Sequence, residues 1–116
     1  MIRLFTLALA ITLLSGCAGF HQKPPRMYWG DYSSSLYEYK RSPTPQALNA
    51  HKATLEDIVN TSKDYGILPP PGISAELGKM YILNGDKARG INLINQEAAD
   101  YPESRQLMTL LLKKVN

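Results

Sequence analysis

Beyond residue 28, apolar side chains recur at the three- and four-residue spacing that places them on one face of an α-helix. The four clearest stripes are Tyr32, Leu36 and Tyr39; Leu48, Leu55, Ile58, Val59 and Tyr65; Leu77, Met80 and Tyr81; and Ala88, Ile91, Ile94 and Ala98. No segment of the sequence sustains the alternating pattern of a β-strand. The chain is therefore predicted to be all-α, built from short antiparallel helices.

Capping residues and prolines divide this pattern into five helices. Asp31 can cap a first helix that runs to about Arg41, and Thr44 with Pro45 begins a second that ends near Gly66. A third helix is predicted from about Ile73 to Leu83, a fourth from the cap Asp86 to Tyr101–Pro102, and a fifth from about Glu103 to Val115.

A different pattern occupies the N-terminus, where an apolar run follows Arg3. The run has the length of a signal-peptide core and is too short for a permanent membrane span. It ends in Leu14, Ser15, Gly16 and Cys17, which resemble the lipobox that signal peptidase reads in bacterial lipoproteins. That resemblance implies cleavage before Cys17 and attachment of a diacylglycerol and an N-acyl chain, such as palmitate, to this cysteine. The alternative is an ordinary secretory peptide with a chance cysteine.

The chain is thus divided into a signal peptide (1–16), a lipidated tether (17–27) and a helical domain (28–116). Pro24 and Pro25 favour extended backbone in the tether. Cys17 is the one cysteine of the chain, so acylation would leave no thiol for a disulfide, a metal or catalysis. Ala18 implies the outer membrane under the common enterobacterial-type sorting rule. We therefore expect a periplasm-facing lipoprotein of a Gram-negative bacterium.

Charge and candidate chemistry argue against two classes of function. After Arg3 is removed, twelve basic and ten acidic residues remain and the basic ones are scattered, which with export argues against nucleic-acid binding. His21 and His51 have no carboxylate at ligand spacing in the sequence. Ser33–Ser35 lack the glycines of a nucleophile elbow, and no phosphate-binding glycine loop is present. We expect a non-enzyme with no metal or cofactor besides the lipid.

Residues 71–104 resemble one tetratricopeptide unit, a helical hairpin of 34 residues. The residues that carry the resemblance are Leu77, Gly78 and Tyr81 of the L-G-x-x-Y core, Gly90 and Ile94 at the small and large apolar positions, and Pro102 at the terminal proline position. Ser74 and Glu97 depart from the pattern, and a generic helical hairpin is the alternative. Such arrays need about three units to bury a continuous face, so self-association or a standing partner is physically attractive.

Two surfaces are candidates for partner binding. Tyr28, Trp29 and Tyr37 lie off the apolar stripe of the first helix, so at least one should reach the surface, to contact a protein, a glycan or lipid headgroups. The last helix carries a second apolar stripe of Met108, Leu112 and Val115. This stripe either inserts between helices of the same domain or binds a partner, and the sequence leaves both interpretations open.

The lipobox, the tether, the segment Tyr28–Tyr32 and the Leu-Gly-x-x-Tyr hairpin together resemble a family of small bacterial lipoproteins of unknown function. These are often encoded beside a curli-secretion-channel-like lipoprotein and a third small lipoprotein. The resemblance implies membership of an envelope complex, with the channel-like lipoprotein as partner. We therefore expect a lipid-anchored, non-enzymatic helical adaptor that assists assembly or stability of an outer-membrane complex. The alternative is an activator of a peptidoglycan-synthesising enzyme. Ten extended tether residues reach about 35 Å at most, which argues mildly against that alternative.

Overall fold

Residues 26–115, which the computed structural model describes, form helices and connecting turns without a β-strand. The helices are α2 (Tyr32–Arg41), α3 (Pro45–Asp64), α4 (Ile73–Leu83), α5 (Lys87–Asp100) and α6 (Arg105–Val115), with a short 3₁₀ helix η1 (Pro102–Ser104) before α6. The predicted all-α class is confirmed.

Several helix ends form where the capping residues predict them. Oγ1 of Thr44 accepts a hydrogen bond from the backbone N–H of Ala47 at 3.1 Å, which satisfies one free donor at the start of α3. The carboxylate of Asp86 accepts from the N–H of Arg89 at 3.2 Å at the start of α5. Gly66 has a φ of +65° just after α3, a conformation that favours glycine. These local signals therefore fix where the helices begin and end.

The first helix starts directly after Asp31 as predicted but without the expected side-chain cap, and the last helix starts later than predicted. The side chain of Asp31 caps no backbone N–H, and only its carbonyl oxygen accepts, from the N–H of Ser35 at 3.0 Å. The last helix begins at Arg105 rather than Glu103, because the chain first makes the tighter turn η1. Proline at the first position of that turn fixes the backbone angle without needing a hydrogen-bond donor.

α4 and α5 form a hairpin at the place of the predicted repeat unit, and two glycines set how closely the helices approach. A Cβ atom at Gly78 would lie 2.8 Å from the carbonyl oxygen of Gly90, and one at Gly90 would lie 2.5 Å from that of Gly78. A backbone carbonyl cannot move aside cheaply, so both positions require glycine. Of the other expected repeat-packing residues, Leu77, Tyr81 and Ile94 are buried in this hairpin, whereas Pro102 is exposed at the start of η1.

The buried side chains form two clusters that share the helix α4. One joins α3 to α4 and contains Leu55, Ile58, Ile73, Leu77 and Tyr81. The other joins α4, α5 and α6 and contains Ala75, Ile94 and Met108. α4 therefore carries apolar contacts on two of its sides and occupies the centre of the fold.

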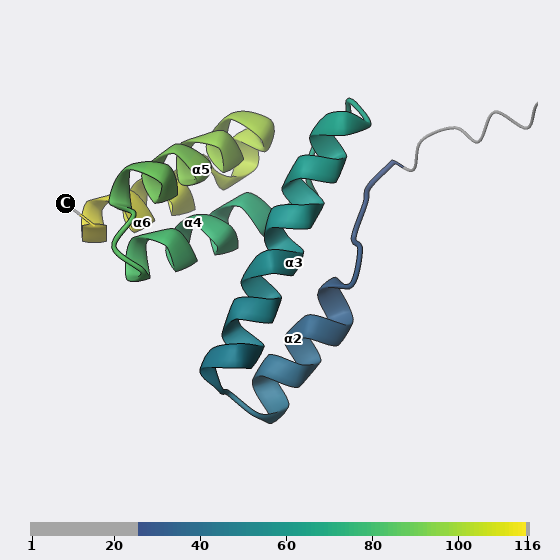
Figure 1. Cartoon of the computed structure of the whole chain (residues 1–116). Helices are drawn as coiled ribbons and strands as arrows, with labels where there is room; N and C mark the ends of the chain where they lie inside the picture. The colour runs from purple at the N-terminus through teal and green to yellow at the C-terminus, as the bar shows by residue number, and fades with distance from the viewer. Residues whose placement is uncertain (1–25, 116) are drawn as a thin grey trace, which may run out of the picture.

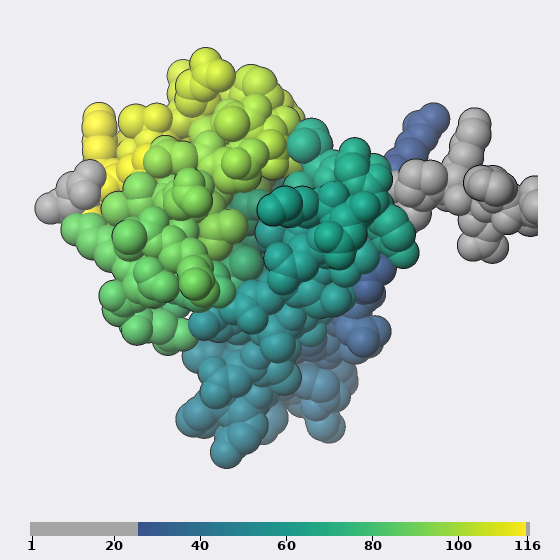
Figure 2. Space-filling view, turned by 45° about the horizontal axis from the view of Figure 1, so that its top comes forward, coloured from purple at the N-terminus to yellow at the C-terminus, as the bar shows by residue number. Residues whose placement is uncertain are grey.

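α3 is the longest helix and lies between α2 on one side and the α4–α5 hairpin on the other (Figure 1). Each helix makes its main contacts with its neighbours in sequence. In the space-filling view, the green-to-yellow part that holds α5 and α6 meets the teal part of α3 along a seam (Figure 2). None of the helices in residues 26–115 has both the length and the apolar character needed to cross a membrane.

Candidate functional site

A chain of hydrogen bonds centred on His51 joins α2, α3 and α4. The imidazole is fully buried; its Nδ1 lies 2.7 Å from Oγ of Ser35 and its Nε2 lies 2.6 Å from Oε1 of Glu76. The hydroxyl of Tyr32 donates to Oε2 of the same carboxylate at 2.9 Å. Because a carboxylate only accepts hydrogen bonds, Nε2 carries the hydrogen in the His51–Glu76 pair. We call Tyr32, Ser35, His51 and Glu76 the His51 clasp.

The clasp changes the acid–base behaviour of its tyrosine. Burial raises the pKa of Tyr32 to about 12, with further contributions from the hydrogen bond to Glu76 and from its negative charge. Two tyrosine rings also pack against the imidazole of His51. Tyr39 stacks on the imidazole of His51 with ring centroids 6.2 Å apart, and Tyr32 lies tilted against it at 5.5 Å. The polar groups are thus satisfied inside an aromatic enclosure.

Serine, histidine and a carboxylate are also the groups of a hydrolytic triad, but the surroundings do not suit that chemistry. Ser35 lies within α2, and its own N–H donates to the carbonyl of Asp31, so it cannot stabilise an oxyanion. Its hydroxyl also lies 3.1 Å from the carbonyl of Tyr32. No carboxylate stands at ligand spacing from His51 in the sequence, but the fold brings Glu76 to it from another helix, 25 residues along the chain. The arrangement suits holding three helices together.

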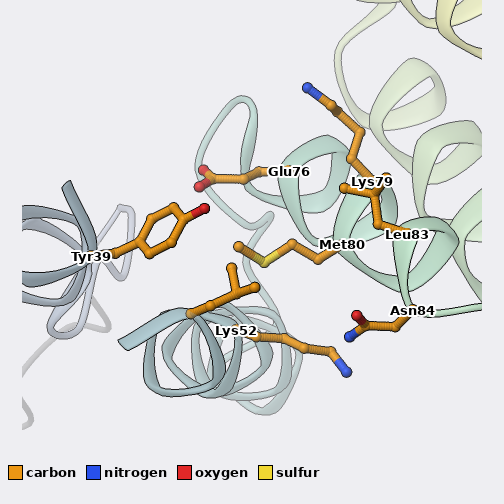
Figure 3. Close-up of a pocket in the computed structure, with 8 residues that line it drawn as sticks. Tyr39, Lys52, Glu76, Lys79, Met80, Leu83 and Asn84 are labelled. Carbon is orange, nitrogen blue, oxygen red and sulfur yellow. The ribbon is translucent and has the colours of Figure 1, made fainter. Parts of the chain in front are cut away.

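Beside the clasp lies a pocket of about 220 Å³ between α2, α3 and α4 (Figure 3). We call it the Met80 pocket; its lining residues are Tyr39, Leu48, Lys52, Glu76, Lys79, Met80, Leu83 and Asn84. Figure 3 shows Tyr39 and Glu76 pointing toward each other from two helices, with Met80 reaching into the space beside them. Because Glu76 belongs to both the clasp and the pocket, the hydrogen bonds of the clasp fix one wall of the pocket.

Tyr81 lines a second hollow and contacts Lys52, which lines the Met80 pocket. Its hydroxyl donates to Glu56 at 2.5 Å and accepts from Arg89 at 3.0 Å, which links α3, α4 and α5. The hydrogen bond to Glu56 and then burial raise the pKa of Tyr81, whereas the hydrogen bond from Arg89 lowers it. The ammonium of Lys52 lies 4.2 Å from the centre of the Tyr81 ring. Lys52 thereby faces the Met80 pocket while its charge is held against an aromatic ring.

The second hollow is a groove between α3 and α5, formed by two adjoining cavities that share Val59, Asn60, Asn92 and Leu93. The remaining residues along it include Glu56, Leu77 and Arg89 at one end and Lys63, Ser74, Gln96 and Asp100 at the other. Among the described residues, the side-chain amides of Asn60 and Asn92 make no hydrogen bond, whereas Gln96 donates to Asp100 at 2.7 Å. We call this hollow the amide groove.

The expected aromatic candidates lie away from both hollows. Trp29 and Tyr37 are exposed, which confirms that at least one ring reaches the surface. Tyr28 is half-buried, donates to Asp57 at 3.0 Å and packs its ring edge against Tyr65. The hydrogen bond to Asp57 is the main cause that raises the pKa of Tyr28. The three aromatic residues line neither the amide groove nor the Met80 pocket.

The apolar stripe of the last helix faces inward, so of the two interpretations that the sequence leaves open the structure favours insertion between helices of the same domain. Met108 is only 4% exposed and packs against Ala75 and Ile94, with Leu112 partly buried beside it. Val115 is half-buried. The exposed apolar side chains of α6 are instead Leu107 and Leu110, at 58% and 56% exposure. The stripe of Met108, Leu112 and Val115 packs inward because α4 and α5 supply apolar partners for it.

Sequence reasoning missed two buried polar side chains that hold helices together, the carboxylate of Glu97 and the imidazole of His51. Glu97, which departs from the repeat pattern, is buried, and its carboxylate accepts from the backbone N–H of Gly72 at 2.7 Å. Glu97 on α5 thereby satisfies a backbone donor at the start of α4. His51 carried a readable signal, because it stands four residues before Leu55 and seven before Ile58, on the core face of α3.

The expected lipid-attachment and peptidase-recognition residues, Leu14, Ser15, Gly16 and Cys17, lie outside the described residues, as does most of the tether. Within residues 26–115 no three His, Cys, Asp or Glu side chains are placed to share a metal ion.

Comparison with known proteins gives one family. Residues 27–111 match the family described as "Domain of unknown function (DUF4810)". No curated protein and no solved structure gives a match. The matched segment spans α2 to the middle of α6 and so includes the His51 clasp, the Met80 pocket and the amide groove. Since this segment covers most of the chain, the protein belongs to the DUF4810 family of small proteins of unknown function.

Proposed function

We propose that the protein is a lipid-anchored, non-enzymatic adaptor that assists assembly or stability of an outer-membrane complex. In this proposal it holds a segment of a curli-secretion-channel-like lipoprotein in the amide groove. The lipid anchor is proposed from the lipobox of the sequence, and the partner is proposed from the family resemblance of the sequence. The observation that carries the binding role is the amide groove itself.

The groove offers what an extended polypeptide segment needs. Val59 and Leu93 supply an apolar floor onto which a partner side chain can be buried. Asn60 and Asn92 face the groove from different helices, and each amide can donate and accept hydrogen bonds at once. Main-chain N–H and C=O groups of a bound segment require both kinds of partner. The groove therefore suits a segment recognised partly through its backbone.

The charges along the groove are mixed rather than of one sign. Glu56 and Arg89 stand at one end, and Lys63 and Asp100 at the other. A groove of this kind selects neither a strongly acidic nor a strongly basic segment. This supports a protein partner over a polyanion.

The test places a photoreactive amino acid at position 60 of the full acylated chain in its own bacterium. Cross-linked proteins are identified by mass spectrometry with and without Asn92→Trp, which should fill the groove. The matched control is Asn95→Trp, since Asn95 is an exposed asparagine on the same helix that lines neither cavity. Both sites are exposed, so each variant should change stability by no more than about 0.5 kcal/mol.

We expect position 60 to capture the channel-like lipoprotein, with capture reduced about tenfold or more by Asn92→Trp and unchanged by Asn95→Trp; loss of a single interface worth about 1.4 kcal/mol already has that effect. If both variants reduced capture equally, or if neither reduced it, the groove would not be part of the interface. Capture of a peptidoglycan-synthesising enzyme instead would replace the adaptor with an activator of that enzyme.

A further inference from the structure

We infer that the Met80 pocket is a second docking site, which takes one bulky apolar side chain of a partner protein with a carboxylate next to it. The site is separate from the amide groove, because the two share no lining residue. The inference therefore stands independently of the proposed function.

The shape of the pocket suits a single anchor side chain. Leu48 from α3 and Met80 from α4 form its apolar surface, and the ring of Tyr39 from α2 closes one side. A volume of about 220 Å³ is sufficient for one leucine- or phenylalanine-sized group. Interfaces commonly rest on a few such anchors buried in fitted pockets. Methionine adapts its shape to different side chains, which suits a docking floor.

Leu83 extends the apolar surface beyond the pocket. Its side chain is 84% exposed at the last turn of α4, and it lines the same pocket as Met80. A single exposed leucine is ordinary on a protein surface, but one that continues an apolar pocket adds to a contiguous patch. A partner side chain in the pocket would remove both Leu83 and Met80 from water.

The charges around the pocket select a carboxylate. Both oxygens of Glu76 are occupied by donors of the His51 clasp, and Lys52 lies 3.8 Å from Glu56 and against the Tyr81 ring. Lys79 is exposed and forms no ion pair with any residue that the structure describes. Among the charged residues that line the pocket, Lys79 is therefore the one without a partner in the part of the chain that the structure describes, and a carboxylate of a bound protein can pair with it.

The end of α4 does not oppose an anion in the way an open helix end would. The carbonyl oxygens of Met80, Tyr81 and Ile82 accept hydrogen bonds from the N–H groups of Asn84, Asp86 and Gly85 in the following turn. These capped carbonyls present little free negative potential to the pocket. The partner that fits is thus an apolar residue flanked by Asp or Glu.

The chain offers a simple spectroscopic test because it has only four methionines. The full chain, labelled with ¹³C at the methionine methyl groups, is placed in phosphatidylcholine nanodiscs, and Met80→Leu assigns the pocket signal. Buried Met108 serves as the internal control, since it lies in the other core cluster. The probes are acetyl-Phe-Asp-amide, acetyl-Phe-Lys-amide and acetyl-Ala-Asp-amide.

We expect acetyl-Phe-Asp-amide to shift the Met80 signal saturably and to leave Met108 unchanged. Acetyl-Phe-Lys-amide should bind about two- to fivefold more weakly, the size of one exposed ion pair. Acetyl-Ala-Asp-amide should bind more weakly still, because it lacks the anchor. Lys79→Glu, at an exposed position, should reverse the preference between the Asp and Lys peptides.

Three results would overturn the inference. The first is the absence of a saturable Met80 shift with any of the three peptides. The second is a preference for Asp over Lys that survives Lys79→Glu. The third is a Met80 shift that follows protein concentration without peptide, which would make a second copy of this chain the occupant.

Discussion

The carboxylate of Glu76 accepts hydrogen bonds from two side chains on two other helices. His51 donates from α3 at 2.6 Å and Tyr32 donates from α2 at 2.9 Å. A buried imidazole without such an acceptor would lose its hydration with no compensation. The single residue Glu76 therefore determines whether the polar interior between these helices is satisfied.

Glu76→Gln keeps the size of the side chain but leaves one carbonyl oxygen to serve both donors. The new NH₂ group cannot accept the hydrogen bond that the carboxylate oxygen receives at its position, and the negative charge that strengthens both hydrogen bonds is lost. We expect the free energy of unfolding to fall by about 1–3 kcal/mol, the cost of one buried unsatisfied group. Urea unfolding followed by circular dichroism measures this. Glu103→Gln, at an exposed site, should change it by less than about 0.5 kcal/mol; a similar loss in both variants would contradict the role given to Glu76.

Because of Tyr32, the free energy of unfolding should change with pH in the alkaline range. Its pKa in the folded state is about 12, above the value of 10.0 expected in the unfolded chain. The folded state therefore favours the neutral phenol, and this stabilisation is fully present below pH 10 and lost as the pH rises toward 12. Tyr32→Phe should be less stable than the native chain at pH 8, and the difference should shrink between about pH 10 and 12. Unfolding curves across that range measure it, and a constant difference would refute it.

The limits of sequence reasoning at this scale come from distance along the chain. The position of His51 on the core stripe of α3 could be predicted from its spacing to Leu55 and Ile58. Its acceptor could not, because Glu76 is 25 residues away and becomes a neighbour only when α4 packs on α3. Glu97 likewise occupies a position where the repeat pattern prefers alanine, and its partner Gly72 lies on another element.

Among the helices, α6 shows what a strongly apolar sequence leaves undecided. Leucines and a methionine cover more than half of its circumference, so spacing alone allows several inward faces. Neighbouring helices make the choice, since Ala75 and Ile94 pack against Met108. Helix ends are easier to predict, because caps such as Thr44 and Asp86 act on backbone groups three residues away.

The two faces of α6 should respond differently to the same charged residue. Met108→Asp would bury an unpaired carboxylate, and we expect loss of cooperative unfolding or a fall of at least about 3 kcal/mol in the free energy of unfolding. Leu110→Asp, on the exposed side, should change it by no more than about 0.5 kcal/mol. Circular dichroism with urea unfolding distinguishes the two. A stable Met108→Asp protein would place this methionine at the surface.

On the scale of the whole molecule, the hollows arise between helices rather than within any one of them. The amide groove exists because α3 and α5 both pack on α4 without filling the space between them. The Met80 pocket needs Tyr39, Leu48 and Met80 from three helices. Spacing predicts which residues share a helix face, but it does not predict how two helices cross. The all-α class could therefore be predicted, whereas both hollows required the structure.

The packing of each helix mainly on its sequence neighbours also bears on how the chain reaches its folded state. Each contact closes a short loop, so little chain entropy is lost before the contact forms. Folding rates rise as contacts become more local, and helical proteins of this kind are among the fast folders. The helices can join one after another along the chain, with few opportunities for pairing in the wrong order.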